Sequence, residues 1–111
     1  MGYGQAPQFL QGTLDLLILR AVLRKPLHGY AIAEVIHTLS DQVLIVEEGS
    51  LYPALHRLEL DGAIESEWGL SENNRRVKYY RITQRGRKRL GEQQAGWDRL
   101  STAISKVLKY A

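Results

Sequence analysis

Residues 71–89 read S-E-N-N-R-R-V-K-Y-Y-R-I-T-Q-R-G-R-K-R, which describes a polar turn, an alternating strand and the start of a helix. Together with Leu70, this stretch holds eight of the fifteen Lys and Arg residues and a single acid, Glu72. The rest of the chain holds seven bases and eleven acids, so a net charge of +3 conceals one strongly positive end. Such a cluster of cations attracts a polyphosphate backbone, although most charged runs form only a solvated surface.

The composition is that of one small domain. At 111 residues, with 44% apolar and 24% charged residues, the chain has the make-up of a soluble globular protein. The absence of cysteine excludes disulfides, thiolate metal sites and a Cys nucleophile. The longest apolar run, residues 14–23, contains Asp15 and Arg20 and is too short to cross a bilayer. With no cleavable signal in view, we expect a cytoplasmic protein with no membrane partner.

Two helices are predicted in the first third of the chain. Gly12 and Thr13 offer an N-terminus, and apolar residues at helical spacing carry the first helix to about Arg24, before Pro26 ends it. This helix is apolar on nearly all sides, which suggests that a partner subunit covers part of it. The second helix is expected over about residues 28–40.

The third helix has the clearest signals. Ser50 is the predicted N-cap, which puts Pro53 at the third helical position, where a missing N–H costs nothing because first-turn donors have no internal partner. Asp61 and Gly62 end the helix in a left-handed conformation. One narrow buried stripe follows the spacing i, i+4 and i+7, at Leu51, Leu55 and Leu58.

A β-hairpin is predicted from two alternating segments, residues 63–68 and residues 77–82. Ile64 and Trp68 share one side of the first segment. In the second segment Tyr80 and Ile82 are expected to face inward with Ile64, leaving Tyr79 and Arg81 outside. Asn73 and Asn74 are expected to form the turn rather than to bind bases.

The last predicted helix, capped by Thr83, covers about residues 84–109. Its first turns carry four bases at the end where the helix dipole disfavours cations, so an external anion would compensate one or two of them. These bases are Arg85, Arg87, Lys88 and Arg89. Further along, apolar residues at heptad spacing form a seam for another helix, comprising Leu90, Trp97, Leu100, Ile104 and Val107.

The order of elements is therefore three short helices, a basic hairpin and a long helix. This order predicts a mainly α (α+β) fold, a winged helix-turn-helix in which the third helix enters the major groove and the hairpin, or wing, lies over phosphates or a minor groove. The predicted division is a flexible arm over residues 1–9, the DNA-binding domain over residues 10–83 and the dimerisation helix over residues 84–111.

Three long motifs resemble the PadR family of bacterial transcriptional regulators. They are L-D-L-L-I-L-R-A-V-L-R-K-P-L-H-G-Y-A-I at 14–32, G-S-L-Y-P-A-L-H-R-L-E-L-D-G-A-I at 49–64 and Y-Y-R-I-T-Q-R-G-R-K-R-L at 79–90. The resemblance covers about residues 10–110 and points to the shorter members with a single C-terminal helix. It implies a homodimer joined by that helix, a repressor role at nearby genes and, in some members, a flat aromatic ligand bound between subunits near a tryptophan.

The candidate DNA-binding residues fall into two groups. Ser50, Tyr52, Pro53 and His56 are expected on the recognition-helix face, and Arg75, Arg76 and Lys78 on the wing. Tyr52 also has a structural interpretation, in which it packs against the domain and exposes only its hydroxyl. Because the helix is poor in Arg, Asn and Gln, specificity is expected to depend on DNA shape and on contacts with thymine methyls.

The candidate dimer and effector residues surround Trp97. This side chain either fills the dimer seam or stacks on an aromatic ligand at the subunit interface, where the resemblance places a tryptophan. The expected neighbours are Leu14, Asp15, Ile18, Leu100 and Ile104.

No constellation of residues supports catalysis. His28, His37 and His56 lack metal-ligand spacing, and the scattered glycines form no phosphate-binding loop, so we expect no enzyme activity, no metal and no cofactor. The predicted function is a homodimeric repressor that binds an inverted repeat in double-stranded DNA, and the family resemblance alone implies that an aromatic effector releases it. The rival is a winged-helix interaction module whose basic wing binds an acidic protein.

Overall fold

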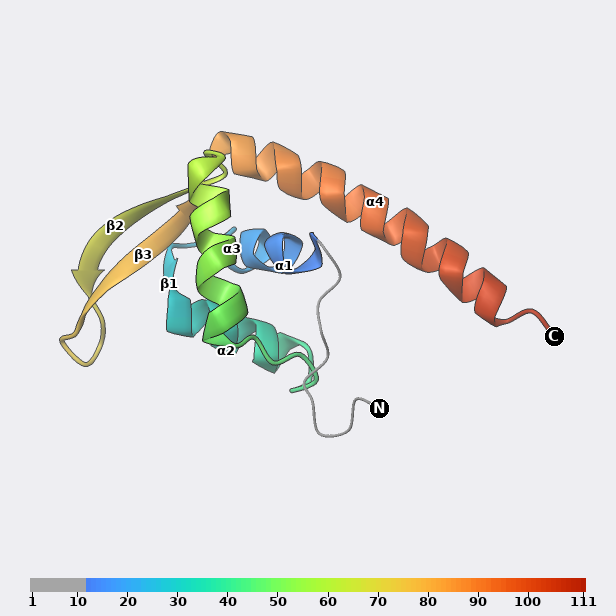
Figure 1. Cartoon of the computed structure of the whole chain (residues 1–111), viewed down its shortest axis with the longest axis horizontal. Helices are drawn as coiled ribbons and strands as arrows, with labels where there is room; N and C mark the ends of the chain where they lie inside the picture. The colour runs from blue at the N-terminus through green and yellow to red at the C-terminus, as the bar shows by residue number, and fades with distance from the viewer. Residues whose placement is uncertain (1–11) are drawn as a thin grey trace.

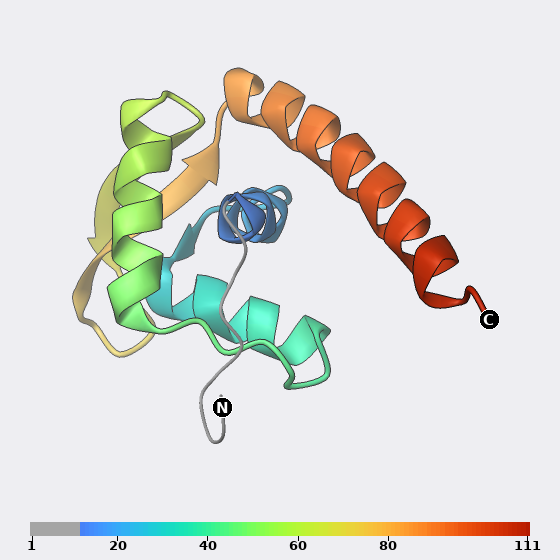
Figure 2. The ribbon, with the colours of Figure 1, turned by 45° about the vertical axis from the view of Figure 1, so that its right-hand side comes forward.

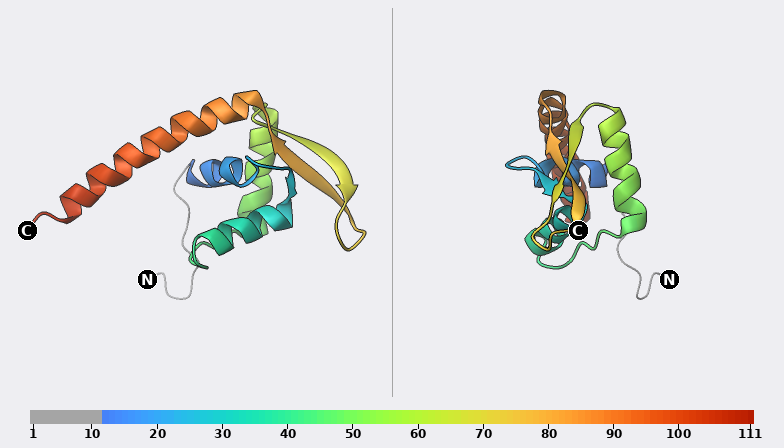
Figure 3. Two further views of the ribbon diagram at one scale, coloured as in Figure 1. Left: turned by 180° about the vertical axis from the view of Figure 1, so that it is seen from behind. Right: turned by 90° about the vertical axis from the view of Figure 1, so that its left-hand side faces the viewer.

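The computed structural model describes residues 12–111, so the arm predicted over residues 1–9 lies outside it (Figure 1). The described part has a helical head, a wing that projects on one side of it, and a long helix that extends on the other (Figures 1 and 3). In chain order the elements are α1 (Thr13–Ala21), β1 (Leu27–His28), α2 (Gly29–Leu39), α3 (Glu48–Leu60), β2 (Ile64–Leu70), β3 (Arg76–Ile82) and α4 (Gln84–Leu108). The predicted mainly helical α+β fold is confirmed.

The core of the head lies among the three short helices. Helix α1 contacts α2, α3 and the first part of α4, and Figure 2 shows it enclosed by them. The stripe predicted on the third helix is confirmed, because its three leucines are buried in the same core cluster as Ile18, Leu19 and Ile32. Close-packed apolar side chains of this kind supply most of the stability of a small domain.

Helix α1 ends at Ala21, three residues before the predicted end. The reason is a tightening of the backbone: the N–H of Leu23 donates to the carbonyl of Arg20 at 3.2 Å, an i to i−3 bond that closes the last turn. No helix in the described part of the chain is long and apolar enough to span a membrane.

The predicted start of the third helix is wrong. Glu47 is the N-cap of α3, since its carbonyl accepts hydrogen bonds from the N–H groups of Ser50 and Leu51 at 3.0 and 2.9 Å. Ser50 therefore lies inside the first turn, and Pro53 lies one turn further into the helix than predicted. Its missing N–H leaves the carbonyl of Gly49 without an intrahelical partner, at a position exposed to water. The predicted end is confirmed, with Gly62 at φ 74°.

The sheet has three strands rather than the two predicted. β1 pairs antiparallel with β3, placing Leu27 opposite Tyr80, and the strand order is β1-β3-β2. A two-residue strand has no alternation to detect in the sequence. The hairpin itself is confirmed: Ile64 pairs with Ile82, and both are buried with Tyr80.

Two side chains of the hairpin differ from the expectation. Tyr79 is half-buried rather than outside, because its ring lies against Gly69 and its hydroxyl donates to the carbonyl of Leu70 at 2.8 Å. Trp68 shares a face with Ile64 but is 54% exposed, since the hairpin projects beyond the core at this point. Arg81 is exposed, as predicted.

Helix α4 begins where predicted. The hydroxyl of Thr83 accepts from the N–H of Gly86 at 3.0 Å and donates to the carbonyl of Gly62 at 2.6 Å, which fixes the start of α4 to the end of α3. A Cβ at Gly86 would lie 2.1 Å from the carbonyl oxygen of Ala63, so only glycine fits this contact. Leu90 is buried against the head, whereas the apolar residues from Trp97 onward are exposed on the free part of the helix.

Candidate nucleic-acid interface

The solvent face of α3 carries all four residues predicted for it. Ser50, Tyr52, Pro53 and His56 are exposed, because the buried stripe holds the opposite side of the helix against the core. Helical spacing places Pro53, His56 and the exposed Leu60 furthest from that stripe. This outermost strip is small: Pro53 and Leu60 are apolar, His56 is its polar member, and it carries no Lys or Arg.

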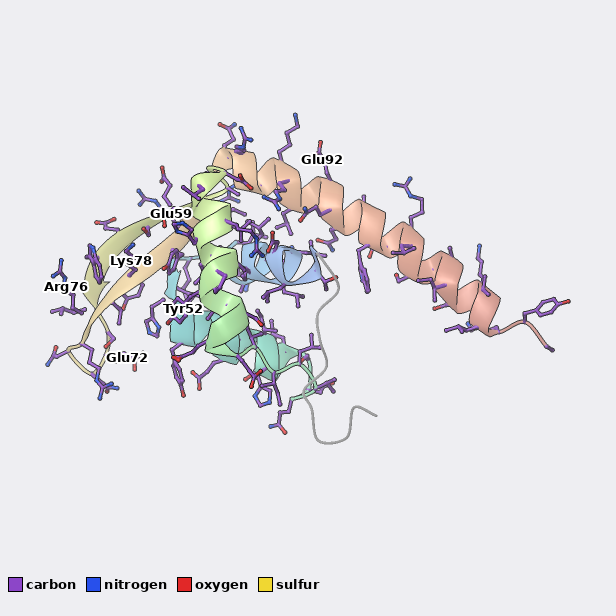
Figure 4. The ribbon with its side chains drawn as sticks, in the orientation of Figure 1. Tyr52, Glu59, Glu72, Arg76, Lys78 and Glu92 are labelled. Atoms are coloured by element: carbon purple, nitrogen blue, oxygen red, sulfur yellow. The ribbon has the colours of Figure 1, made fainter. Side chains whose placement is uncertain are left out.

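Tyr52 combines the two interpretations left open by the sequence. It is 46% exposed, and its ring also packs on the start of α2, where a Cβ at Gly29 would lie 2.7 Å from the hydroxyl oxygen. Figure 4 shows Tyr52 on the side of α3 that faces the wing. The side chain therefore packs between α2 and α3, the two helices of the helix-turn-helix, while the other face of its ring remains accessible.

The base of the wing is tied to α3. The hydroxyl of Ser66 in β2 donates to the carboxylate of Glu59 at 2.5 Å. Beside it, the pKa of Tyr80 is raised, chiefly because burial disfavours the phenolate and secondarily because Glu59 and Tyr52 would add negative charge nearby. These contacts fix the angle at which the wing leaves the head.

The tip of the wing is a closed turn. The N–H of Ser71 donates to the carbonyl of Arg75 at 2.8 Å, and the N–H of Arg75 donates back to the hydroxyl of Ser71 at 3.2 Å. Asn74 has φ 60°, a left-handed conformation that asparagine tolerates, which confirms its predicted role in the turn.

The three predicted wing cations are uncompensated. Within residues 12–111, no carboxylate forms an ion pair with Arg75, Arg76 or Lys78. Arg76 and Lys78 instead lie at Trp68, with the guanidinium carbon 4.4 Å and the ammonium nitrogen 5.5 Å from the indole centroid. A ring attracts a cation without cancelling its charge.

These parts border one groove of about 820 Å³ between the wing and the helix-turn-helix. Its walls are Tyr52, the first residues of α2 and the wing face that carries Trp68, Arg76 and Lys78, and Arg75 also lines it. Two carboxylates, Glu34 and Glu72, also line it. The groove is therefore cationic and aromatic on one wall and open to solvent.

The other cations of the basic stretch have different surroundings. Arg81 pairs with Glu65 at 3.0 Å and lies 3.9 Å from Glu67. Arg89 donates to Asp15 at 3.1 Å and to Asp61 at 3.3 Å, so α4 is linked to both α1 and the end of α3. The remaining bases at the start of α4, Arg85, Arg87 and Lys88, are exposed.

Asp15 is a buried carboxylate inside the head, whereas the sequence predicted it beside Trp97 at the dimer interface. It accepts from Arg57 of α3 at 3.2 Å through one oxygen and from Arg89 of α4 through the other. The side chain of Arg57 is 59% exposed and that of Arg89 28% exposed. Sequence analysis missed this triad because the partners lie 42 and 74 residues away along the chain.

The predicted effector and dimer residues divide into two groups. Leu14, Asp15 and Ile18 belong to the buried interior of the head, whereas Trp97, Leu100 and Ile104 are exposed on α4. The single chain therefore does not bring all six to one surface. The histidines have no metal-binding partners: no group of three His, Asp or Glu side chains in the described part could hold a metal. His28 instead caps α2, its Nδ1 accepting from the N–H of Ala31 at 3.2 Å.

A family model described as the Transcriptional regulator PadR-like family matches residues 18–92. The chain belongs to this family. The PadR-like match covers the end of α1, all of α2 and α3, the wing and the first part of α4. It is a family of transcriptional regulators rather than of enzymes.

Similar proteins agree with this membership. A transcriptional regulator of Mycobacterium tuberculosis is 33% identical over 97 residues, which cover 87% of each chain. A structure of a transcriptional regulator from Clostridium thermocellum is 33% identical with a TM-score of 0.80, covering 89% of this chain and 96% of that one. A PadR-like transcriptional regulator from Bacillus cereus is 30% identical with a TM-score of 0.79, covering 95% and 100%.

Proposed function

We propose that this PadR-like protein is a transcriptional repressor that binds double-stranded DNA as a homodimer. The observation that carries the proposal is the groove between the wing and the helix-turn-helix, which is lined by Tyr52 of α3 and by the three uncompensated wing cations. A duplex offers a major groove wide enough for one helix, with phosphates on both sides of it. When α3 lies in the major groove of the DNA, the wing cations reach the phosphate strand that flanks it.

The exposed apolar residues of α4 support the homodimer. Trp97, Leu100 and Ile104 recur at heptad spacing on the part of the helix that leaves the head. A second copy of α4 packed along this seam buries apolar surface that one chain leaves in water. Two-fold symmetry then presents two α3 helices to successive major grooves, about 34 Å apart, on an inverted-repeat operator.

The composition of the α3 face supports a particular mode of recognition. Pro53 and Leu60 present apolar surface, and His56 is the polar side chain between them. Apolar contact with thymine methyls and sequence-dependent DNA shape suit such a surface better than bidentate base pairing does.

The test of DNA binding uses random-sequence duplexes at several salt concentrations. Affinity should fall steeply with ionic strength, and replacing Arg75 and Arg76 together with Ala should weaken binding to every duplex and reduce the log–log salt slope by about 2 per subunit, or about 4 for the dimer. The matched control is Arg20→Ala with Arg24→Ala, two exposed cations that do not line the groove. No duplex affinity in dilute buffer, or binding of an acidic protein segment alone, would favour the rival interaction module.

The effector proposal rests on Trp97, which is 40% exposed at the expected dimer seam. We propose that a planar aromatic molecule stacks there between subunits and releases the dimer from DNA. In a Trp68→Phe variant, which leaves Trp97 as the only tryptophan, such compounds should quench fluorescence and lower duplex affinity together. Quenching that also occurs in Trp97→Phe, or no quenching, would remove this part of the proposal.

A further inference from the structure

Trp68 is an exposed aromatic residue that the core does not explain. The core residues of the sheet end at Tyr80, and the indole lies further out on the same face of the hairpin, opposite Lys78 in the β2–β3 register. A large aromatic left 54% exposed contributes little to the packing of the domain.

Its contacts are instead with the two cations that face the groove. Arg76 and Lys78 both lie within cation–π distance of the ring, and all three side chains line the groove wall opposite Tyr52. Long basic side chains lose rotamer freedom when they bind a phosphate, and a ring that already restricts them lowers that loss. A carboxylate could restrict them equally well, but it would cancel the charge that the phosphate needs.

We propose that Trp68 is a positioning residue for DNA binding: it holds Arg76 and Lys78 toward the groove, ready for one phosphate strand of a duplex. The inference rests on the proposed function, and it specifies which face of the wing contacts the DNA. In this arrangement the face with Trp68 contacts the backbone, and the opposite face, with Glu65, Glu67 and Arg81, does not.

The experiment is a substitution series measured on one duplex. Cation–π attraction decreases from Trp to Phe and is absent in Leu, so affinity should follow the order wild type, Trp68→Phe, Trp68→Leu, with a total loss of about five- to tenfold. The salt slope should stay that of the wild type, because no charge is removed. Thermal unfolding of Trp68→Leu should match the wild type, which separates positioning from a structural role.

A coupled variant makes the test sharper. In a chain that carries Arg76→Ala and Lys78→Ala, replacing Trp68 with Leu should cost no further affinity at low salt, because no cations remain to be positioned. The same loss in that background would mean that the indole itself contacts DNA, and the inference would be wrong. Equal affinity of Trp68→Leu and the wild type would also overturn it. A wild-type chain that binds no duplex would instead overturn the proposed function.

Discussion

Two pairs of cations in this molecule are held in opposite ways. Arg57 and Arg89 form ion pairs with the buried carboxylate of Asp15, which compensates their charge within the fold. Arg76 and Lys78 lie at the exposed ring of Trp68, where their charge stays available. Arg76, Lys78 and Arg89 come from the same basic stretch of sequence, so the partner rather than the residue type decides which cations serve stability and which serve binding.

The largest expected effect is on stability and comes from removing the carboxylate of Asp15, which Arg57 and Arg89 share. Asp15→Asn should lower the free energy of unfolding by about 2–3 kcal/mol, because it removes the buried carboxylate on which both guanidinium groups converge and leaves Arg89 paired with Asp61 alone. The value is below that of a fully buried pair, since Arg57 is partly solvated. Urea denaturation measures it.

The matched control is Glu65→Gln, which breaks the exposed pair with Arg81 on the wing. It should cost less than about 0.5 kcal/mol, as surface ion pairs generally do. An equal decrease in the free energy of unfolding for Asp15→Asn and Glu65→Gln would show that the buried triad stabilises the fold no more than a surface ion pair does.

Local patterns in the sequence predicted most of the fold. Three features were found in this way: the buried stripe of α3, the inward-facing side of the hairpin and the Thr83 cap. Each depends on residues a few positions apart, so periodicity and capping chemistry suffice to predict it. The start of α3 was missed because the carbonyl of Glu47, which any residue could supply, closes its first turn. β1 was missed because it exists only by pairing with β3.

The candidate site was predictable to a similar extent. Its exposed residues were found because charge, turn residues and helix face are visible in a linear sequence. The role of Asp15 could not be found, since Arg57 and Arg89 approach it only after the chain has folded. The exposure of Trp68 was hidden for the same reason: alternation predicts a face of a strand, not where the core beneath it ends.

The second prediction exchanges one cation of each pair for alanine. Arg89→Ala should lower the free energy of unfolding by about 1–2 kcal/mol, because its guanidinium is mostly buried and bonds to both Asp15 and Asp61. Arg76→Ala should change stability by less than about 0.5 kcal/mol and weaken duplex binding by roughly tenfold at low salt. Thermal unfolding and duplex titration of both variants provide the comparison. If Arg76→Ala destabilised the fold as much as Arg89→Ala, the division between the two pairs would not hold.

The third prediction concerns the acids that share the groove with the wing cations. Glu72→Gln should raise duplex affinity by about two- to threefold at low salt, because a carboxylate near a phosphate strand is repelled by it. Glu92→Gln removes the same charge from α4, away from the groove, and should have no such effect (Figure 4). Salt-dependent titration distinguishes the two, and an equal gain in both would indicate a dependence on net charge alone.

The smallest expected effect lies at the base of the wing, on which the placement of Trp68 and its cations depends. The raised pKa of Tyr80 means that the folded chain holds the phenol proton more tightly than the unfolded chain. Stability from this group is therefore complete below about pH 10, the ordinary tyrosine value, and is lost as the pH rises through the higher pKa of the folded state. Denaturation midpoints measured from neutral to alkaline pH should fall less steeply in Tyr80→Phe than in the wild type. Tyr110→Phe, which alters an exposed tyrosine near the chain end, should keep the wild-type fall. An unchanged alkaline slope in Tyr80→Phe would mean that the wing base does not depend on keeping this phenol neutral.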